Sequence, residues 1–226
     1  MSRLGRPRLH LRSIGSTNAR ARELAEAGAP HGTAVTADEQ TAGRGRQGRG
    51  WSTPPGSALA LSLVIRDPDP LLSLRGGLAV ADLAGEDARV KWPNDVLVDG
   101  RKVAGVLAEG RPQERWAVLG IGVNAALDLA LLPDEVRGRA GTLGLEPREL
   151  QHALAQLLAA LEIRLAEAPE TTLAVLRRRD ALTGQPVRWE RGEGTGAGIA
   201  DDGTLLVRDA GGAVHALSAG EVHLLG

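Results

Sequence analysis

Residues 89–124 read RVKWPNDVLVDGRKVAGVLAEGRPQERWAVLGIGVN, and this stretch decides the fold. It contains three apolar runs, at 96–98, 102–108 and 116–123. An Asp99-Gly100 pair separates the first two, and Asp-Gly between apolar runs is the strongest short-range signal for a β-hairpin. The stretch therefore predicts an antiparallel meander.

Helices and further strands are predicted on both sides of the meander. Apolar spacing and capping residues indicate, in chain order, a helix over 19–27 capped by Ser16 or Thr17 and stopped by Gly28, an extended segment over 33–37, a buried strand over 57–65, a helix over 70–84, a helix opened by Pro147, and a helix over 170–179. We therefore expect an α/β (α+β) domain with a mixed, largely antiparallel sheet.

The pattern changes near Gly184. From there, short alternating runs at 187–189, 197–199, 205–207 and 214–216 are separated by Asp202-Gly203 and Gly211-Gly212 turns. Short strands of this kind predict a small β-barrel appended to the α/β domain. We expect one domain over residues 1–182 and a second over 183–226.

Composition restricts the function classes. The chain of 226 residues is 42% hydrophobic and 24% charged, with a net charge of -1 and no cysteine. A net charge near zero does not indicate a DNA-binding surface. The lack of cysteine excludes disulfides, zinc-thiolate sites and thiol nucleophiles. No segment has the pattern of a signal peptide or a membrane span, so we expect a cytoplasmic protein without a membrane partner.

Rare residue types mark a candidate site. Of 27 basic residues only Lys91 and Lys102 are lysine, and the asparagines are Asn18, Asn94 and Asn124. The chain contains few lysines and asparagines, and chance explains the presence of any single one about as well as function does. The prediction therefore rests on where these residues lie as a group. The set falls in three short segments, at 16–18, 91–102 and 120–124.

A glycine–arginine loop, GRGRQGRGW at residues 43–51, is a second candidate. Glycine lets a backbone approach an anion closely, and the forked donors of arginine suit phosphate or carboxylate. The glycines also match the dinucleotide fingerprint GxGxxG, but that motif needs a helix to follow, whereas Pro54 and Pro55 indicate a continuing loop. We predict a phosphate-handling loop; a solvated flexible loop is the alternative.

These groups suit an enzyme that activates a carboxylic acid with ATP. The carboxylate and the α-phosphate repel each other, so cations must neutralise charge and a loop must close over the product. The loop arginines fit that role, and Lys91 is a compact charge that can bridge both anions. Asn94, Asp95 and Asn124 offer oxygen ligands for Mg²⁺, although Asn94 and Asp95 are also typical turn residues.

The ordered motifs resemble those of biotin protein ligases over nearly the whole chain. The matching segments are Ser16-Thr17-Asn18, Gln40 with residues 43–49, residues 91–95, residues 100–105 and residues 120–124. The resemblance implies a class II aminoacyl-tRNA-synthetase-like catalytic domain followed by an SH3-like barrel. Because only fifteen residues precede Ser16, it also implies the ligase-only type without a DNA-binding domain.

The activity implied by this resemblance has two steps. Biotin and ATP, with Mg²⁺, give biotinyl-5′-AMP and pyrophosphate. The adenylate then acylates a lysine on the biotin carrier domain of a biotin-dependent carboxylase. The resemblance leaves the oligomeric state of this chain open between a monomer and a homodimer.

The resemblance also implies residue roles. Biotin would be bound by Ser16, Thr17, Asn18, Gln40, Gly43, Arg44, Lys91 and Gly105. The nucleotide would be bound by Gly45, Arg46, Arg49, Trp51, Asn94, Lys102 and Asn124, with Asn124 also a ligand of Mg²⁺. Lys91, Arg46 and Asp95 would be catalytic, with Asp95 as a candidate base for the acceptor lysine.

Two other functions stay open at this stage. A lipoyl or octanoyl ligase shares the chemistry but uses a different acid, and a non-catalytic biotin or nucleotide sensor would bind without reacting. The arginine–glycine loop and the terminal barrel favour biotin. Lys91 argues against a sensor, because binding alone would tolerate arginine there.

Overall fold

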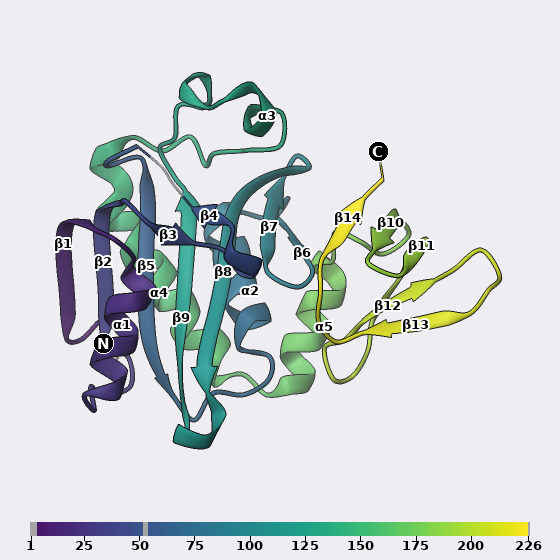
Figure 1. Cartoon of the computed structure of the whole chain (residues 1–226), viewed down its shortest axis with the longest axis horizontal. Coiled ribbons are helices and arrows are strands. Elements are labelled where there is room, and N and C mark those ends of the chain that lie inside the picture. Colours follow the sequence, from purple (N-terminus) through teal and green to yellow (C-terminus); the bar gives the residue numbers. More distant parts are fainter. Residues whose placement is uncertain (1–3, 52–53, 226) are drawn as a thin grey trace.

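A computed structural model describes residues 4–51 and 54–225 and places a seven-stranded sheet at the centre of the larger part of the chain (Figure 1). The strand order is β1 (Arg8–Ile14), β2 (Ala34–Gln40), β5 (Ala58–Arg66), β9 (Trp116–Asn124), β8 (Arg101–Arg111), β7 (Asp95–Val98) and β6 (Arg89–Lys91). β1 and β2 are parallel, and the other neighbouring pairs are antiparallel. The predicted mixed sheet and the β7–β8–β9 meander are confirmed.

Helices cover both faces of this sheet (Figure 1). α1 (Thr17–Glu26) packs on one face, and α2 (Leu72–Ala84) and α4 (Leu150–Ala166) pack on the other, followed by α5 (Pro169–Arg179). All four predicted helices are confirmed, and the Ser16 side chain caps α1. Within the part of the chain that the structure describes, no helix combines the length and apolar character needed to cross a bilayer.

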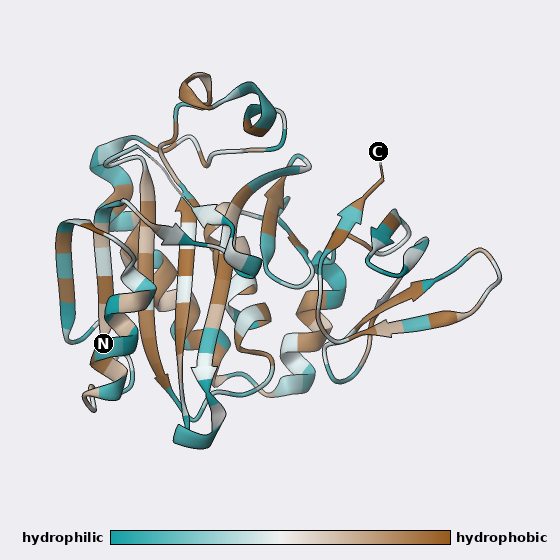
Figure 2. Ribbon diagram, in the orientation of Figure 1, coloured by the Kyte–Doolittle hydropathy of each residue, from teal (hydrophilic) through white to brown (hydrophobic). Residues whose placement is uncertain are grey.

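Alternation along β5 explains how one strand serves two cores. Leu61 and Leu63 belong to the core beneath α2 and α4, whereas Val64 joins the smaller core beneath α1. Successive strand residues point to opposite faces, so an almost continuous apolar run is buried on both sides. Apolar residues are accordingly concentrated in β5 and β9 (Figure 2).

A fully buried arginine joins the helices of the larger core. Arg75 of α2 is 2% exposed and donates to the side chains of Asp69 and Thr172. It also donates to the carbonyls of Arg164 and Glu167, at the end of α4 and just beyond it. A buried charge requires such partners, so Arg75 fixes the positions of α4 and α5 on α2.

The carboxy-terminal part forms a five-stranded antiparallel sheet. Its order is β13 (Val214–Leu217), β12 (Leu205–Arg208), β11 (Gly192–Ile199), β10 (Pro186–Trp189) and β14 (Val222–Leu224). The four predicted strands are confirmed. The sheet packs onto the main core, and Trp92 Nε1 donates to the carbonyl of Gly203 at 3.1 Å.

Several elements were not predicted from the sequence. β1 and β6 are edge strands, and β1 is half exposed, so neither carries a strong apolar pattern. Short elements complete the fold: β3 (Gly43–Arg44), η1 (Arg46–Gly48), β4 (Gly50–Trp51), η2 (Pro112–Glu114), η3 (Leu129–Leu131), α3 (Asp134–Arg137) and η4 (Pro147–Glu149).

Candidate active site

The floor of the candidate site is a patch of glycine on the α1 face of the sheet. Gly122 of β9 pairs with Gly105 of β8. A Cβ atom at Gly122 would lie 2.5 Å from the Trp51 ring, and one at Gly120 would lie 2.1 Å from Oδ1 of Asn18. The absence of side chains at these positions lets Trp51 and Asn18 lie directly on the strands.

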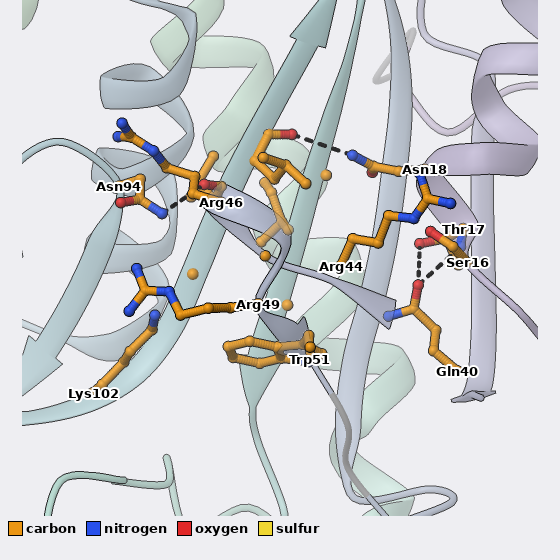
Figure 3. Close-up of a pocket in the computed structure, with 18 residues that line it drawn as sticks. Ser16, Thr17, Asn18, Gln40, Arg44, Arg46, Arg49, Trp51, Asn94 and Lys102 are labelled. Carbon is orange, nitrogen blue, oxygen red and sulfur yellow. Dashed lines mark hydrogen bonds between the residues drawn. The ribbon is translucent and has the colours of Figure 1, made fainter. Parts of the chain in front are cut away.

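A cavity of about 120 Å³ lies above this floor and collects most of the predicted site residues (Figure 3). Those that line it are Ser16, Thr17, Asn18, Gln40, Arg44, Gly45, Arg46, Arg49, Trp51, Asn94, Lys102 and Gly105. They come from the start of α1, the end of β2, the 43–51 loop, the β6–β7 turn and β8. Segments far apart in the sequence therefore meet at one site.

Neutral hydrogen-bonding groups gather at one end of the cavity. Oε1 of Gln40 accepts from the backbone N of Thr17 at 2.8 Å and from its Oγ1 at 2.9 Å (Figure 3). Since the backbone N–H can only donate, the Gln40 amide is oriented, and its Nε2 atom stays available as a donor. This end offers neutral donors and acceptors, and the Arg44 side chain, which also lines the cavity, extends toward it (Figure 3).

Cations gather at the other end. Arg46, Arg49 and Lys102 line the cavity there, with Lys102 Nζ 5.7 Å from the centre of the Trp51 ring (Figure 3). Nζ of Lys102 is paired with Oδ1 of Asp95 at 2.6 Å. This end of the site therefore carries more positive than negative charge.

Burial lowers the pKa values of two cations in this region, Lys91 and Arg46. The pKa of Lys91 falls below its ordinary value chiefly because the ammonium is desolvated; Asp95 opposes the shift, and the nearby Lys102 adds to it. The pKa of Arg46 is also lowered, again mainly by burial, with Asp95 opposing and Arg49 adding to the shift. An anion bound here would relieve that cost, so the arrangement suits a carboxylate or phosphate.

The glycine–arginine loop is folded over the cavity as a hairpin of β3 and β4 around η1. The chain reverses at Gln47 and Gly48, which have positive φ angles of 55° and 75°. Arg49 is ion-paired with Glu221, and Arg46 Nη2 donates to the carbonyl of Gly220 at 3.2 Å. The carboxy-terminal segment therefore holds the loop in place.

Four predicted residues do not line the cavity. Gly43 packs its backbone against Trp51, where a Cβ would lie 2.2 Å from the carbonyl oxygen. Lys91 and Asp95 are cross-strand partners on β6 and β7, next to Lys102. Asn124 ends β9, is 6% exposed, and donates through Nδ2 to the carbonyl of Gly141 at 3.0 Å.

Other lining residues were given no individual role from the sequence, although some of them lie in the predicted 43–51 loop or in the candidate segment 120–124. They are Gly50, Val106, Leu107, Gly120, Ile121 and Gly122. The alternation of small residues along β9 is the sequence signal that could have identified the floor. Among the residues that the structure describes, no cluster of three or more carboxylate or imidazole groups could hold a metal ion.

Comparison with known proteins gives a consistent picture. The model of the biotin/lipoate A/B protein ligase family matches residues 11–125. The chain is 37% identical over 232 residues to the biotin--[acetyl-CoA-carboxylase] ligase of Mycobacterium tuberculosis, covering 92% of this chain and 85% of that protein. It is 40% identical over 142 residues to the bifunctional ligase/repressor BirA of Bacillus spizizenii, and there the match spans 44% of the relative, less than half its length.

Solved structures agree with the sequence matches. The biotin protein ligase from Aquifex aeolicus, in complex with biotin and ATP, superposes with a TM-score of 0.79 at 27% identity. That match covers 96% of this chain and 98% of the other. The likeness therefore includes the carboxy-terminal sheet as well as the larger one.

Proposed function

Because the chain belongs to the biotin/lipoate A/B protein ligase family, we propose that it activates biotin with ATP and transfers it to a lysine of a biotin carrier domain. One observation carries the choice of biotin: a single cavity joins a neutral hydrogen-bonding end to a cationic end. Biotin has the same polarity, with a neutral cyclic urea at one end and a carboxylate at the other. The names of the Mycobacterium and Aquifex relatives support the proposal.

In the first step, a carboxylate oxygen of biotin attacks the α-phosphorus of ATP, and the bond to pyrophosphate breaks. Thr17 and Gln40 hold the urea, while the cationic end neutralises the two approaching anions. Lys91 and Arg46 are the catalytic groups in this proposal. Their lowered pKa values fit sites that gain from an incoming anion.

In the second step, the acceptor amine attacks the acyl carbon of the adenylate and AMP leaves. The amine must first lose its proton. Asp95 is the candidate base, and it would take the proton only after releasing Lys102. The loop at 43–51 shields the adenylate from water until the acceptor arrives.

Mg²⁺ would enter with ATP. It prefers oxygen ligands and usually retains waters, and it is bound through substrate phosphates with one or two protein oxygens. Asn124 would be the candidate ligand, because its amide nitrogen is bonded to the carbonyl of Gly141 and only its side-chain oxygen is left for an ion, although Asn124 lies beside the cavity and not in its lining. The ion would screen the charge of the phosphates.

The finer architecture belongs to the same proposal. The large mixed sheet would be a class II aminoacyl-tRNA-synthetase-like domain over residues 1–182, and the five antiparallel strands an SH3-like barrel over 183–226. The partner would be the carrier domain of a carboxylase, met in the cytoplasm by a monomer or a homodimer of this chain.

A lipoyl or octanoyl ligase is the second candidate. The acyl chains of those acids carry no neutral polar ring that would use Thr17 and Gln40, which favours biotin. A non-catalytic sensor would have no need for Lys91 beside the other cations.

Biotin-dependent exchange of pyrophosphate into ATP tests the proposal, followed by labelling of a carrier domain. We expect exchange with biotin and Mg²⁺. Exchange with lipoate but not with biotin would contradict the proposal that the acid is biotin. Tight biotin binding without exchange would favour a non-catalytic sensor.

A further inference from the structure

A histidine on the last strand faces the cationic end of the site from the carboxy-terminal sheet. His223 lies in β14, and its Nε2 atom is 3.5 Å from Oε2 of Glu221, whose other carboxylate oxygen is paired with Arg49 of the glycine–arginine loop. Figure 1 shows β14 close to β6, the strand that carries Lys91, and the charge of Lys91 acts on His223. The His223 side chain is 57% exposed, so a ligand can reach it.

Positive charge surrounds His223 on several sides. Four cations act on it from β6, the loop, β10 and the segment after α3, and they are Lys91, Arg49, Arg188 and Arg139. The carboxylate that faces it, Glu221, is shared with the loop. Burial and these four charges together hold the pKa of His223 below its ordinary value, so the imidazole is neutral near neutral pH.

The same cations continue the cationic end of the cavity on the side away from its neutral end. Arg49 and Lys102 line the cavity there (Figure 3), and the backbone N of Lys102 donates to the carbonyl of Arg139 at 2.8 Å. In the proposed first step, the attacking and leaving oxygens lie roughly in line at the α-phosphorus. Because the carboxylate of biotin approaches from the neutral end, pyrophosphate must leave on the opposite side, toward Arg139, Lys91 and His223.

We propose that His223 is a further binding residue for the β- and γ-phosphates of ATP, and that it takes up a proton from solvent when they bind. The inference rests on the proposed function, which supplies the direction of the leaving group. A bound polyphosphate offsets the surrounding positive charge and favours the imidazolium, which donates a hydrogen bond to a phosphate oxygen. The pKa of His223 is then higher with phosphate bound than without it. Phosphate binding should therefore strengthen as pH falls through the higher of these two values.

Binding of inorganic pyrophosphate tests the inference without turnover. Pyrophosphate and Mg²⁺ are titrated calorimetrically into protein saturated with biotin, in two buffers of different ionisation enthalpy, so that proton uptake is measured. We expect uptake by the unaltered protein near neutral pH and a clear loss of it in His223→Gln. The variant should bind pyrophosphate about fivefold more weakly at about pH 6.5 and within about twofold at about pH 8.5, because the imidazole is neutral at the higher pH. Protonation of pyrophosphate itself affects both proteins alike.

Two further variants separate charge from structure. His223→Arg stays charged, so it should bind pyrophosphate without the pH dependence that the histidine adds. His152→Gln removes an exposed histidine of α4 and should change neither affinity nor proton uptake.

The outcomes also separate this inference from the proposed function. Pyrophosphate binding without proton uptake in the unaltered protein overturns the inference, and so does equal uptake in His223→Gln. A loss confined to the KM for the carrier domain would assign His223 to partner docking and overturn it as well. Proton-linked pyrophosphate binding that depends on His223, without biotin-dependent exchange, would overturn the proposed function alone.

Discussion

Nζ of Lys102 lies 2.6 Å from Oδ1 of Asp95, and Asp95 pairs across strands with Lys91. The Asp95 carboxylate is thus ion-paired with Lys102 and also acts electrostatically on Lys91. Its charge raises the pKa of Lys91 against the effect of burial. Asp95 therefore stabilises the charges of the two lysines, and it would have to give up this role in order to serve as a base.

Asp95→Asn tests that order of roles. Without the carboxylate, Lys102 loses its partner and the pKa of Lys91 falls further, so adenylate formation should slow by about tenfold, equivalent to one lost charge-assisted bond. Transfer from preformed adenylate, followed in a single turnover, should change less. A selective loss of transfer by about 10² or more would instead identify Asp95 as the base.

The lowered pKa of Lys91 predicts an alkaline limb in the pH profile of the enzymatic rate. Only the charged ammonium neutralises phosphate, and because burial lowers its pKa, the charge is lost as pH rises through a value below the ordinary 10.5. The kcat/KM for ATP should therefore fall on that limb. Bound ATP favours the ammonium, so the limb in kcat should lie at higher pH. Lys91→Arg should be slower but should lack the limb, since arginine stays charged.

Gly122→Ala should displace Trp51 from the floor. The added methyl would lie 2.5 Å from the ring, and overpacking of this kind costs about 1–3 kcal/mol, so biotin binding should weaken by roughly tenfold or more. Calorimetric titration with biotin measures this. Gly138→Ala, where the new Cβ meets nothing within 4 Å, is the control, and equal weakening in both variants would rule out the Trp51 contact as the cause.

Arg46→Ala should shorten the lifetime of bound biotinyl-5′-AMP. The guanidinium lines the cavity, and a hydrogen bond to a charged group is worth about 1.5–3 kcal/mol, so release should accelerate by roughly 10- to 100-fold. Release can be followed by chasing labelled adenylate, with thermal unfolding to show that the fold is intact. Arg101→Ala, at an exposed position outside the cavity, is the comparison. An unchanged lifetime would show that Arg46 does not hold the adenylate in the cavity.

Local pattern in the sequence was enough for much of the fold. The Asp99-Gly100 turn and its flanking apolar runs predicted the meander, and Ser16 predicted the start of α1, because hairpins and caps depend on neighbouring residues. Edge strand β1 escaped prediction since one half-exposed, weakly patterned strand carries little periodic signal.

Rare residue types and ordered motifs identified the candidate site in the sequence. They did not show how the strands and loops bring its residues together. Gly105 and Gly122 become a floor only through strand register, since a slip of one residue in either strand would turn that strand's glycine to the other face. Arg49 meets Glu221, and Asn18 meets Glu109, across long sequence separations.

The sequence by itself therefore determined which elements form and which chemical groups are present, since both follow from local composition and spacing. Only the tertiary structure decided that Gly43 supports Trp51, that Asn124 bonds to Gly141 and that Glu109 orients Asn18. These relationships depend on non-local register and packing, and a linear pattern does not encode which distant side chains will face each other.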